Sequence, residues 1–168
     1  MQRLWAPWRE GYITKVINNQ HRGCIFCRVL KSNKDAKNYI FLRSPLAFAV
    51  LNIYPYSNGH CLILSNRHVS DISQLTPAEI QAMMELLLEA KKLLQKTLKP
   101  HGFNIGLNLG RMAGAGIPGH VHVHVVPRWQ GDHNFMPVTA GTKVISQSLG
   151  KIYELLTDVP RKKSSGLW

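Results

Sequence analysis

Acidic residues and long apolar runs are both scarce in this chain, and each shortage narrows what the protein can be. Nine Asp and Glu oppose 21 Lys and Arg among 168 residues, which gives a formal net charge of +12. No stretch approaches the ~20 apolar residues that span a bilayer, so no membrane segment is expected. The segment Met1–Arg9 lacks the apolar core of a secretion signal, and we expect the protein to be cytoplasmic.

Cysteine is scarce as well. An odd total of three argues against a framework of disulfides. Cys24 and Cys27 form a Cys-x-x-Cys pair, which suits a metal or redox chemistry. Cys61 lies in an apolar stretch and is expected to be a small buried hydrophobe.

The positive charge favours a polyanionic ligand such as a nucleotide. The basic residues are dispersed, however, in a stretch at 31–37, along a predicted helix at 91–99 and near residue 162. Neither an arginine-rich block nor an RNA-binding signature is present, so nucleic acid is not expected as a partner.

The order of elements predicts one α+β domain over residues 1–168, with an arm over 1–38 and a loose tail over 158–168. Short strands are expected at 39–43, 48–52 and 60–64, and again at 103–108 and around 120–126. A long helix should precede the last two strands, and a C-terminal helix should span 144–156. We therefore predict an antiparallel sheet packed on one long helix.

The long helix is predicted to begin after Thr76. Thr76-Pro77-Ala78-Glu79 is a capping box with proline at the first helical position. Apolar residues then recur at helical spacing and predict one buried stripe, which comprises Ile80, Met83, Leu87, Ala90, Leu94 and Leu98. Met84 is also interpreted as core filling, and Pro100 and Gly102 end the helix.

Three histidines alternate with valines in the run from Gly119 to Pro127. The valines indicate a strand, so His120, His122 and His124 are predicted to line one face, about 7 Å apart along it. Such a row suits either an extended anionic substrate or a metal ion. A solvent-facing strand would accept Thr, Lys or Ser as readily, which disfavours a purely structural interpretation.

The preceding loop matches the spacing of a dinucleotide-binding glycine motif at Gly114, Gly116 and Gly119. That motif must open a helix, whereas Pro118 and a valine-rich strand follow here, so we reject it. Glycines still let backbone N–H groups approach and cradle phosphate oxygens.

Taken in order, these motifs resemble the histidine triad superfamily of nucleotide hydrolases and transferases. The resemblance rests on Asn108-x-Gly110, the glycine loop, the run His120–Pro127, and the upstream Asn58-Gly-His60 and Asn66-Arg-His68. Three further segments resemble its bacterial diadenosine tetraphosphate phosphorylase branch, namely Leu4–Trp8, Pro127–Asp132 and Asn134–Pro137.

The resemblance implies cleavage of dinucleoside polyphosphates, such as diadenosine tetraphosphate, or related adenosine nucleotides. His122 would be the nucleophile of a covalent nucleotidyl-histidine intermediate, with water or phosphate as the acceptor. Substrate contacts are implied for Asn108, His124, Gly116, His60 and Asn52. Where many relatives carry Gln-Ser or Gln-Thr before the triad, this loop has Gly116-Ile-Pro118, so phosphate binding would rest on the backbone and on Asn108, Arg111 or Arg128.

The resemblance also implies a structural zinc ion held by Cys24, Cys27, His68 and His120, and a homodimer formed through the long helix and a strand. Two alternatives stay open. The three histidines could be zinc ligands of a metal-dependent hydrolase, or the chain could be a nucleotide- or nucleic-acid-binding module without catalysis.

Overall fold

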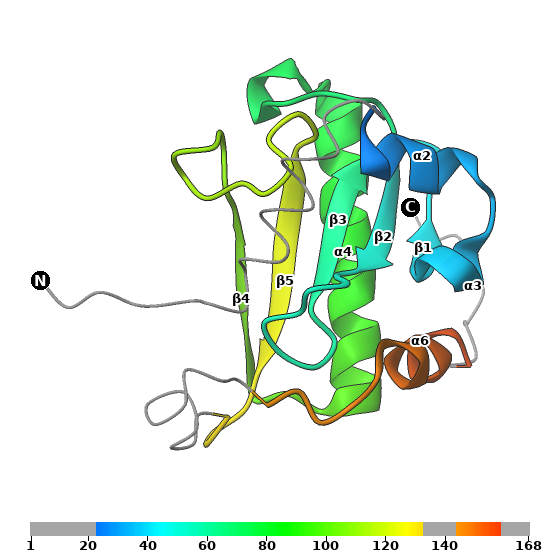
Figure 1. Cartoon of the computed structure of the whole chain (residues 1–168), viewed down its shortest axis with the longest axis vertical. Helices are drawn as coiled ribbons and strands as arrows, with labels where there is room; N and C mark the ends of the chain where they lie inside the picture. The colour runs from blue at the N-terminus through cyan, green and yellow to red at the C-terminus, as the bar shows by residue number, and fades with distance from the viewer. Residues whose placement is uncertain (1–22, 133–143, 159–168) are drawn as a thin grey trace, which may run out of the picture.

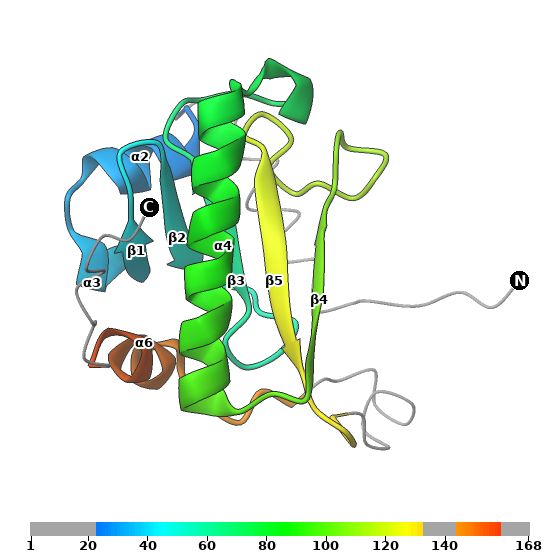
Figure 2. The same cartoon turned by 180° about the vertical axis from the view of Figure 1, so that it is seen from behind.

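The computed structural model describes residues 23–132 and 144–158. A single sheet carries a long helix on one face and short helices on the other face and at one edge (Figures 1 and 2). The segments Leu4–Trp8 and Asn134–Pro137 and nearly all of the predicted tail lie outside the described residues. Among the described residues no helix is both long and apolar enough to cross a membrane. Cytoplasmic residence and the single-domain organisation stay predictions.

The sheet has five antiparallel strands in the order β1-β2-β3-β5-β4. They are β1 Ile40–Arg43, β2 Ala47–Leu51, β3 Cys61–Ser65, β4 Gly102–Leu107 and β5 His122–Arg128. Because side chains alternate between faces along a strand, the register decides which residues share a face. His122 and His124 oppose Leu64 and Leu62 of β3, and Gly106 of β4 opposes His124.

The helix α4, Pro77–Leu98, covers one face of the sheet (Figure 2). Thr76 and Glu79 form the predicted capping box, with both reciprocal hydrogen bonds present. The buried residues of α4 pack on alternate strand residues such as Ala49, Ile63 and Val125. Burying such apolar surface contributes roughly 25 cal/mol per Å², and this core is the main support of the sheet.

Two residues of α4 that were expected in the core, Ile80 of the predicted stripe and Met84, were assigned wrongly. Ile80 and Met84 are 48% and 53% exposed, whereas Met83 is buried as expected. The buried face is shifted around the helix because Leu86 and Leu93 also point inward. Ile80, Met84 and Leu88 form an exposed apolar row instead.

The opposite face of the sheet is covered in part by the helix α2, Ile25–Lys31 (Figure 1). Its Phe26 joins an apolar cluster with Phe48, Val50, Leu62 and Leu64. The helix α3, Asp35–Asn38, leads into β1, and α6, Leu149–Thr157, packs near α4 and β1. A short 3₁₀ helix, η2 Ile72–Gln74, precedes α4 and was not predicted. All the predicted strands and the long helix are present within a few residues of their expected bounds, whereas α6 begins at Leu149 rather than at Val144.

Candidate active site and metal-binding cluster

The first histidine of the triad differs from the prediction. The strand β5 begins at His122, so His120 lies just before it rather than within it. The backbone N–H of Val121 donates to the carbonyl of Val69 at 2.7 Å, a contact outside the sheet. His120 is therefore free to serve a different group of residues from His122 and His124.

His122 is held in one orientation by the backbone of the same segment. Its Nδ1 lies 2.8 Å from the carbonyl oxygen of His120. A carbonyl only accepts, so the ring proton is on Nδ1 and donates, which leaves the lone pair on Nε2. Burial lowers the pKa of His122 below its ordinary value of 6.5, because it disfavours the charged ring. At neutral pH the ring is thus a neutral imidazole with an available Nε2 lone pair.

His124 is oriented by His60. The Nε2 of His60 lies 3.0 Å from Nδ1 of His124, and the backbone N–H of Tyr56 donates to Nδ1 of His60 at 3.0 Å. Because Nδ1 of His60 accepts, the proton of the neutral ring is on Nε2 and is donated to His124. His124 then accepts at Nδ1 and, as a neutral ring, carries its own proton on Nε2. His122 and His124 are therefore opposite tautomers. Nε2 of His122 carries a lone pair, and Nε2 of His124 carries a proton.

The rings of His122 and His124 lie close together. The ring centroids of His122 and His124 are 5.0 Å apart, shorter than the strand repeat of about 7 Å, because the rings lean toward each other. One group attached to His122 can therefore also contact His124. His60 is 1% exposed and is both a core residue and a partner of the triad.

Tyr56 and Asn52 complete this network. The Tyr56 ring stacks on His60, with centroids 4.7 Å apart and planes 25° apart. The amide nitrogen of Asn52 lies 3.3 Å from Nδ1 of His60. Tyr56 was not predicted, since it lies in a turn region where neither periodicity nor a motif singles it out.

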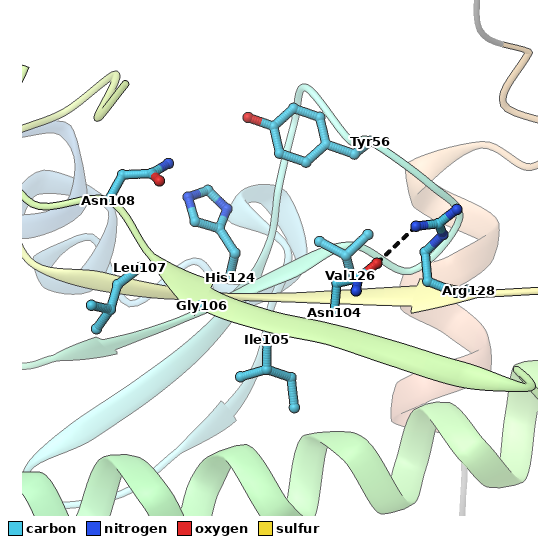
Figure 3. A pocket seen from close by; sticks show the side chains of 9 residues that line it. All are labelled: Tyr56, Asn104, Ile105, Gly106, Leu107, Asn108, His124, Val126 and Arg128. Atoms are coloured by element: carbon cyan, nitrogen blue, oxygen red, sulfur yellow. Dashed lines mark hydrogen bonds between the residues drawn. The ribbon is translucent and has the colours of Figure 1, made fainter. Parts of the chain in front are cut away.

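A cleft of about 380 Å³ opens beside His124 on the same face of the sheet. Figure 3 shows Tyr56 above it, Asn108 at one end and Arg128 at the other. It is lined by Tyr56, Asn104, Ile105, Gly106, Leu107, Asn108, His124, Val126 and Arg128. Asn108 follows the end of β4 and lies beside His124 in the lining, whereas Gly116 and Asn52 are not part of the lining. The alternation of side chains along β4 and β5 could have identified Asn104 and Val126.

Arg128 forms hydrogen bonds with other side chains of the protein and is not available to bind phosphate as predicted. Its guanidinium makes a bidentate ion pair with Asp132, at 2.6 and 2.9 Å, and donates to the side-chain oxygen of Asn104 at 2.7 Å. Asp132 raises the pKa of Arg128 further by accepting these bonds. Arg128 was one of the two arginines predicted to bind phosphate. Its hydrogen bonds instead join the end of β5 to Asn104 of β4 and to Asp132.

The four residues expected to bind metal come together although they are far apart in sequence. One ligand atom each of Cys24, Cys27, His68 and His120 lies within 4.8 Å of all the others. Sγ of Cys27 is 3.4 Å from Nδ1 of His68, and Sγ of Cys24 is 3.5 Å from Nδ1 of His120. Four ligands at the zinc distances of sulfur and nitrogen would be roughly 3.4–3.8 Å apart at tetrahedral angles. The cluster fits a tetrahedral divalent cation.

The remaining contacts of the cluster support this fit. His120 uses Nε2 to donate to the carbonyl of Ser65 at 2.9 Å, so Nδ1 carries the lone pair that a metal requires. Burial, with Cys24 as a close neighbour, raises the pKa of Cys27, and a bound divalent cation would favour the thiolate instead. Cys61 is fully buried away from the cluster, as expected, and burial raises its pKa to about 12.

The metal-binding cluster and the triad adjoin each other through Phe26. The Phe26 ring lies 5.7 Å from the His120 ring, edge on, and 5.4 Å from the His122 ring. Phe26 and Cys27 belong to the same helix, α2. A contact that holds α2 in place therefore also holds the Phe26 ring against the His122 ring.

Comparison with known proteins agrees with the fold. The HIT domain family matches residues 33–131. An AP-4-A phosphorylase from Mycobacterium tuberculosis is 38% identical over 161 residues, covering 93% of this chain and 83% of that protein. The chain belongs to the HIT domain family.

Two further similarities are more distant. A bis(5'-nucleosyl)-tetraphosphatase (asymmetrical) from Schizosaccharomyces pombe is 33% identical over 93 residues, covering 55% of this chain and 50% of that protein. The crystal structure of a Zn-bound histidine triad family protein from Mycobacterium smegmatis has a TM-score of 0.66 at 24% identity, covering 80% of this chain and 91% of that one. The latter shows that the fold is shared.

Proposed function

We propose that the protein cleaves dinucleoside polyphosphates, such as diadenosine tetraphosphate, by transferring a nucleotidyl group through His122. The observation that carries this proposal is the hydrogen bond from Nδ1 of His122 to the carbonyl of His120. It leaves Nε2 as a neutral nucleophile beside the cleft. The similarity to an AP-4-A phosphorylase over most of both chains supports this substrate class.

The reaction has two steps. In the first, Nε2 of His122 attacks the α-phosphorus, a P–N bond forms, and the bond to the bridging oxygen breaks. The leaving oxygen, on a nucleoside polyphosphate, accepts a hydrogen bond from Nε2–H of His124. In the second, an acceptor oxygen attacks phosphorus and releases His122. Asn108 and loop N–H groups would stabilise charge on the phosphate oxygens.

Inorganic phosphate is the proposed acceptor. The relative that matches 93% of this chain is named a phosphorylase, and the loop ahead of the triad carries Gly116-Ile-Pro118 instead of Gln-Ser or Gln-Thr. Phosphate would yield a nucleoside diphosphate and water a nucleoside monophosphate, so the products identify the acceptor.

We assign zinc to the cluster of Cys24, Cys27, His68 and His120. Two thiolates and two imidazoles at tetrahedral separations are the donor set that zinc prefers. A four-ligand site is closed, so the ion would supply cross-linking of α2 to the sheet and no bound water for the reaction. The alternative of a catalytic metal held by the whole triad is disfavoured, because His120 belongs to the cluster with the two cysteines and His124 accepts a hydrogen bond from His60 at Nδ1, which leaves a proton on its Nε2.

A homodimer is proposed from the exposed apolar surface beside the sheet edge. Ile80, Met84 and Leu88 line the outer side of α4, and Ile105 and Leu107 are exposed on the edge strand β4. Lys91, further along α4, lies 5.5 Å above the Phe103 ring of β4, so this side of the helix faces that strand. A second copy could cover both and pair the two β4 edges.

The chemistry is tested by trapping the intermediate. The protein is mixed with diadenosine tetraphosphate and quenched in alkali, where phosphoramidates persist, and peptide mass spectrometry locates the adenylyl group. We expect it on His122, and no adduct in a folded His122→Ala variant. Products with and without inorganic phosphate then identify the acceptor. A His122→Ala protein with full turnover would refute the proposal, and nucleotide binding without turnover would favour a non-catalytic module.

A further inference from the structure

The cleft extends to only one side of the triad. It begins at His124 and follows β5 through Val126 to Arg128, and follows β4 through Gly106 to Asn104 (Figure 3). At a strand rise of roughly 3.3 Å per residue, it spans about 13 Å from position 124 to position 128. His122 is not part of its lining, so the cleft leads away from the nucleophile.

The lining suits a nucleoside better than a phosphate chain. Among the described residues, Arg128 is the one lysine or arginine in the lining, and the charge of Arg128 is matched by Asp132 at 2.6 Å. Asn108, assigned above to the phosphate oxygens, lies at the His124 end, and the remaining surface comprises the Tyr56 ring, the amide of Asn104, and apolar or backbone groups. An aromatic ring, an amide group and an apolar floor are what a base and a ribose require.

We propose that this cleft holds the second nucleoside of the substrate, the one that departs with the leaving polyphosphate. The inference rests on the proposed function, because it takes His122 as the attacking group. Phosphoryl transfer places the leaving oxygen opposite the nucleophile, and His124 lies between His122 and the cleft. The leaving part of the substrate is therefore directed along β5, over Val126, with its base beside Tyr56.

The size and rigidity of the cleft agree with this occupant. A volume of about 380 Å³ lies in the range of small-molecule sites. Tyr56 is fixed by stacking on His60, so a base that contacts it orders little additional side chain. The protein would then distinguish a dinucleoside polyphosphate from a mononucleotide with the same phosphate chain.

The test compares diadenosine tetraphosphate with adenosine tetraphosphate, which has the same four phosphates and lacks the second nucleoside. Both yield the same adenylyl-His122 adduct. We expect kcat/KM to favour diadenosine tetraphosphate at least about fivefold, the lower end of what stacking of one base on an aromatic side chain contributes.

Two variants fill the cleft without touching His122. Val126→Phe enlarges a floor residue, and Gly106→Val adds a Cβ that meets no atom within 4 Å, so its fold is expected to persist. The matched control is Gly102→Val, the same change on the same strand, where the added Cβ likewise meets nothing and the residue lies outside the lining. Val126→Phe and Gly106→Val should bring the ratio of the two kcat/KM values toward one, and Gly102→Val should leave it unchanged.

Two outcomes overturn the inference. Equal kcat/KM for the two substrates in the unmodified protein would show that the second nucleoside is not recognised. An unchanged preference in both cleft-filling variants would place its recognition elsewhere. Neither outcome touches the proposed function, which fails instead if adenylyl-His122 forms from neither substrate.

Discussion

His60 and His124 lie 3.0 Å apart, ring nitrogen to ring nitrogen, although 64 residues separate them in the sequence. The backbone N–H of Tyr56 occupies the other ring nitrogen of His60. The backbone at Tyr56 thereby places the proton of His60 on Nε2, and this proton is donated to Nδ1 of His124. The proton of His124 is therefore on Nε2. The relationship makes His60 a positioning residue whose effect on the reaction is exerted through His124.

Replacing His60 by alanine should lower kcat more than it changes KM. We expect a loss of roughly tenfold to hundredfold, part of what a positioned proton donor contributes, because His124 would no longer be held in one tautomer. His60→Gln retains an N–H near the position of Nε2 and should recover part of the rate. Steady-state kinetics on folded variants measure both effects. Equal loss in the two variants would contradict the tautomer argument.

Removing the metal should destabilise the protein without abolishing formation of the adduct. A strong chelator should release one ion per chain and lower the free energy of unfolding, by about 4 kcal/mol relative to protein with free metal a thousandfold above Kd. Cys27→Ser should bind less metal, whereas Cys61→Ala, away from the cluster, should retain it. Elemental analysis and thermal unfolding provide the readouts. Complete loss of the adduct from folded apoprotein would instead favour a catalytic metal.

Glu79 should make stability depend on pH in the acidic range. Hydrogen bonds from Arg67 and from the Thr76 backbone lower its pKa from 4.5 to about 2. A depressed pKa means that its contribution is present above pH 4.5 and is lost as pH falls toward 2. Glu79→Gln should cost about 1–3 kcal/mol at pH 7 and progressively less below pH 4.5. Urea unfolding at pH 7 and pH 3 measures this, with Glu89→Gln as a surface control. An equal destabilisation by Glu79→Gln at the two pH values would contradict the prediction.

Introducing a charge into the exposed row of α4 should separate the proposed dimer. Met84 is 53% exposed and lies between Ile80 and Leu88. Met84→Glu should give a monomer by light scattering, because a carboxylate would be buried without a partner in the interface. Glu89→Gln, on a different side of the helix, should not change the mass. A monomeric unmodified protein would remove the proposal altogether.

Much of the fold followed from local patterns. The capping box at Thr76 and Glu79 placed the start of α4 because its hydrogen bonds involve only neighbouring residues. The strands were found from alternation and turns. Errors arose where the sequence pattern fits more than one arrangement. Ile80 and Met84 have the spacing of a core stripe, yet the angle at which α4 meets the sheet leaves them exposed.

Some residues of the candidate site were likewise predicted from the sequence, and others were missed or misassigned. The placement of His122 and His124 on one face followed from alternation, and the resemblance to a family supplied Cys24, Cys27, His68 and His120. Tyr56 was missed because no pattern marks its contact with His60, and Arg128 was assigned to phosphate because its pairing with Asp132 depends on a turn after β5.

By itself, the sequence determined the N-terminal cap of α4, the strand faces and the kinds of side chain available for chemistry, since these depend on residues within one or two turns of each other. Tertiary structure alone decided that β5 begins only at His122, so that His120 leaves the row of the triad, and that His60 reaches His124. Those contacts join segments tens of residues apart, and their geometry is fixed by the order and register of the strands. Where a proton resides on each ring is thus a property of the folded sheet.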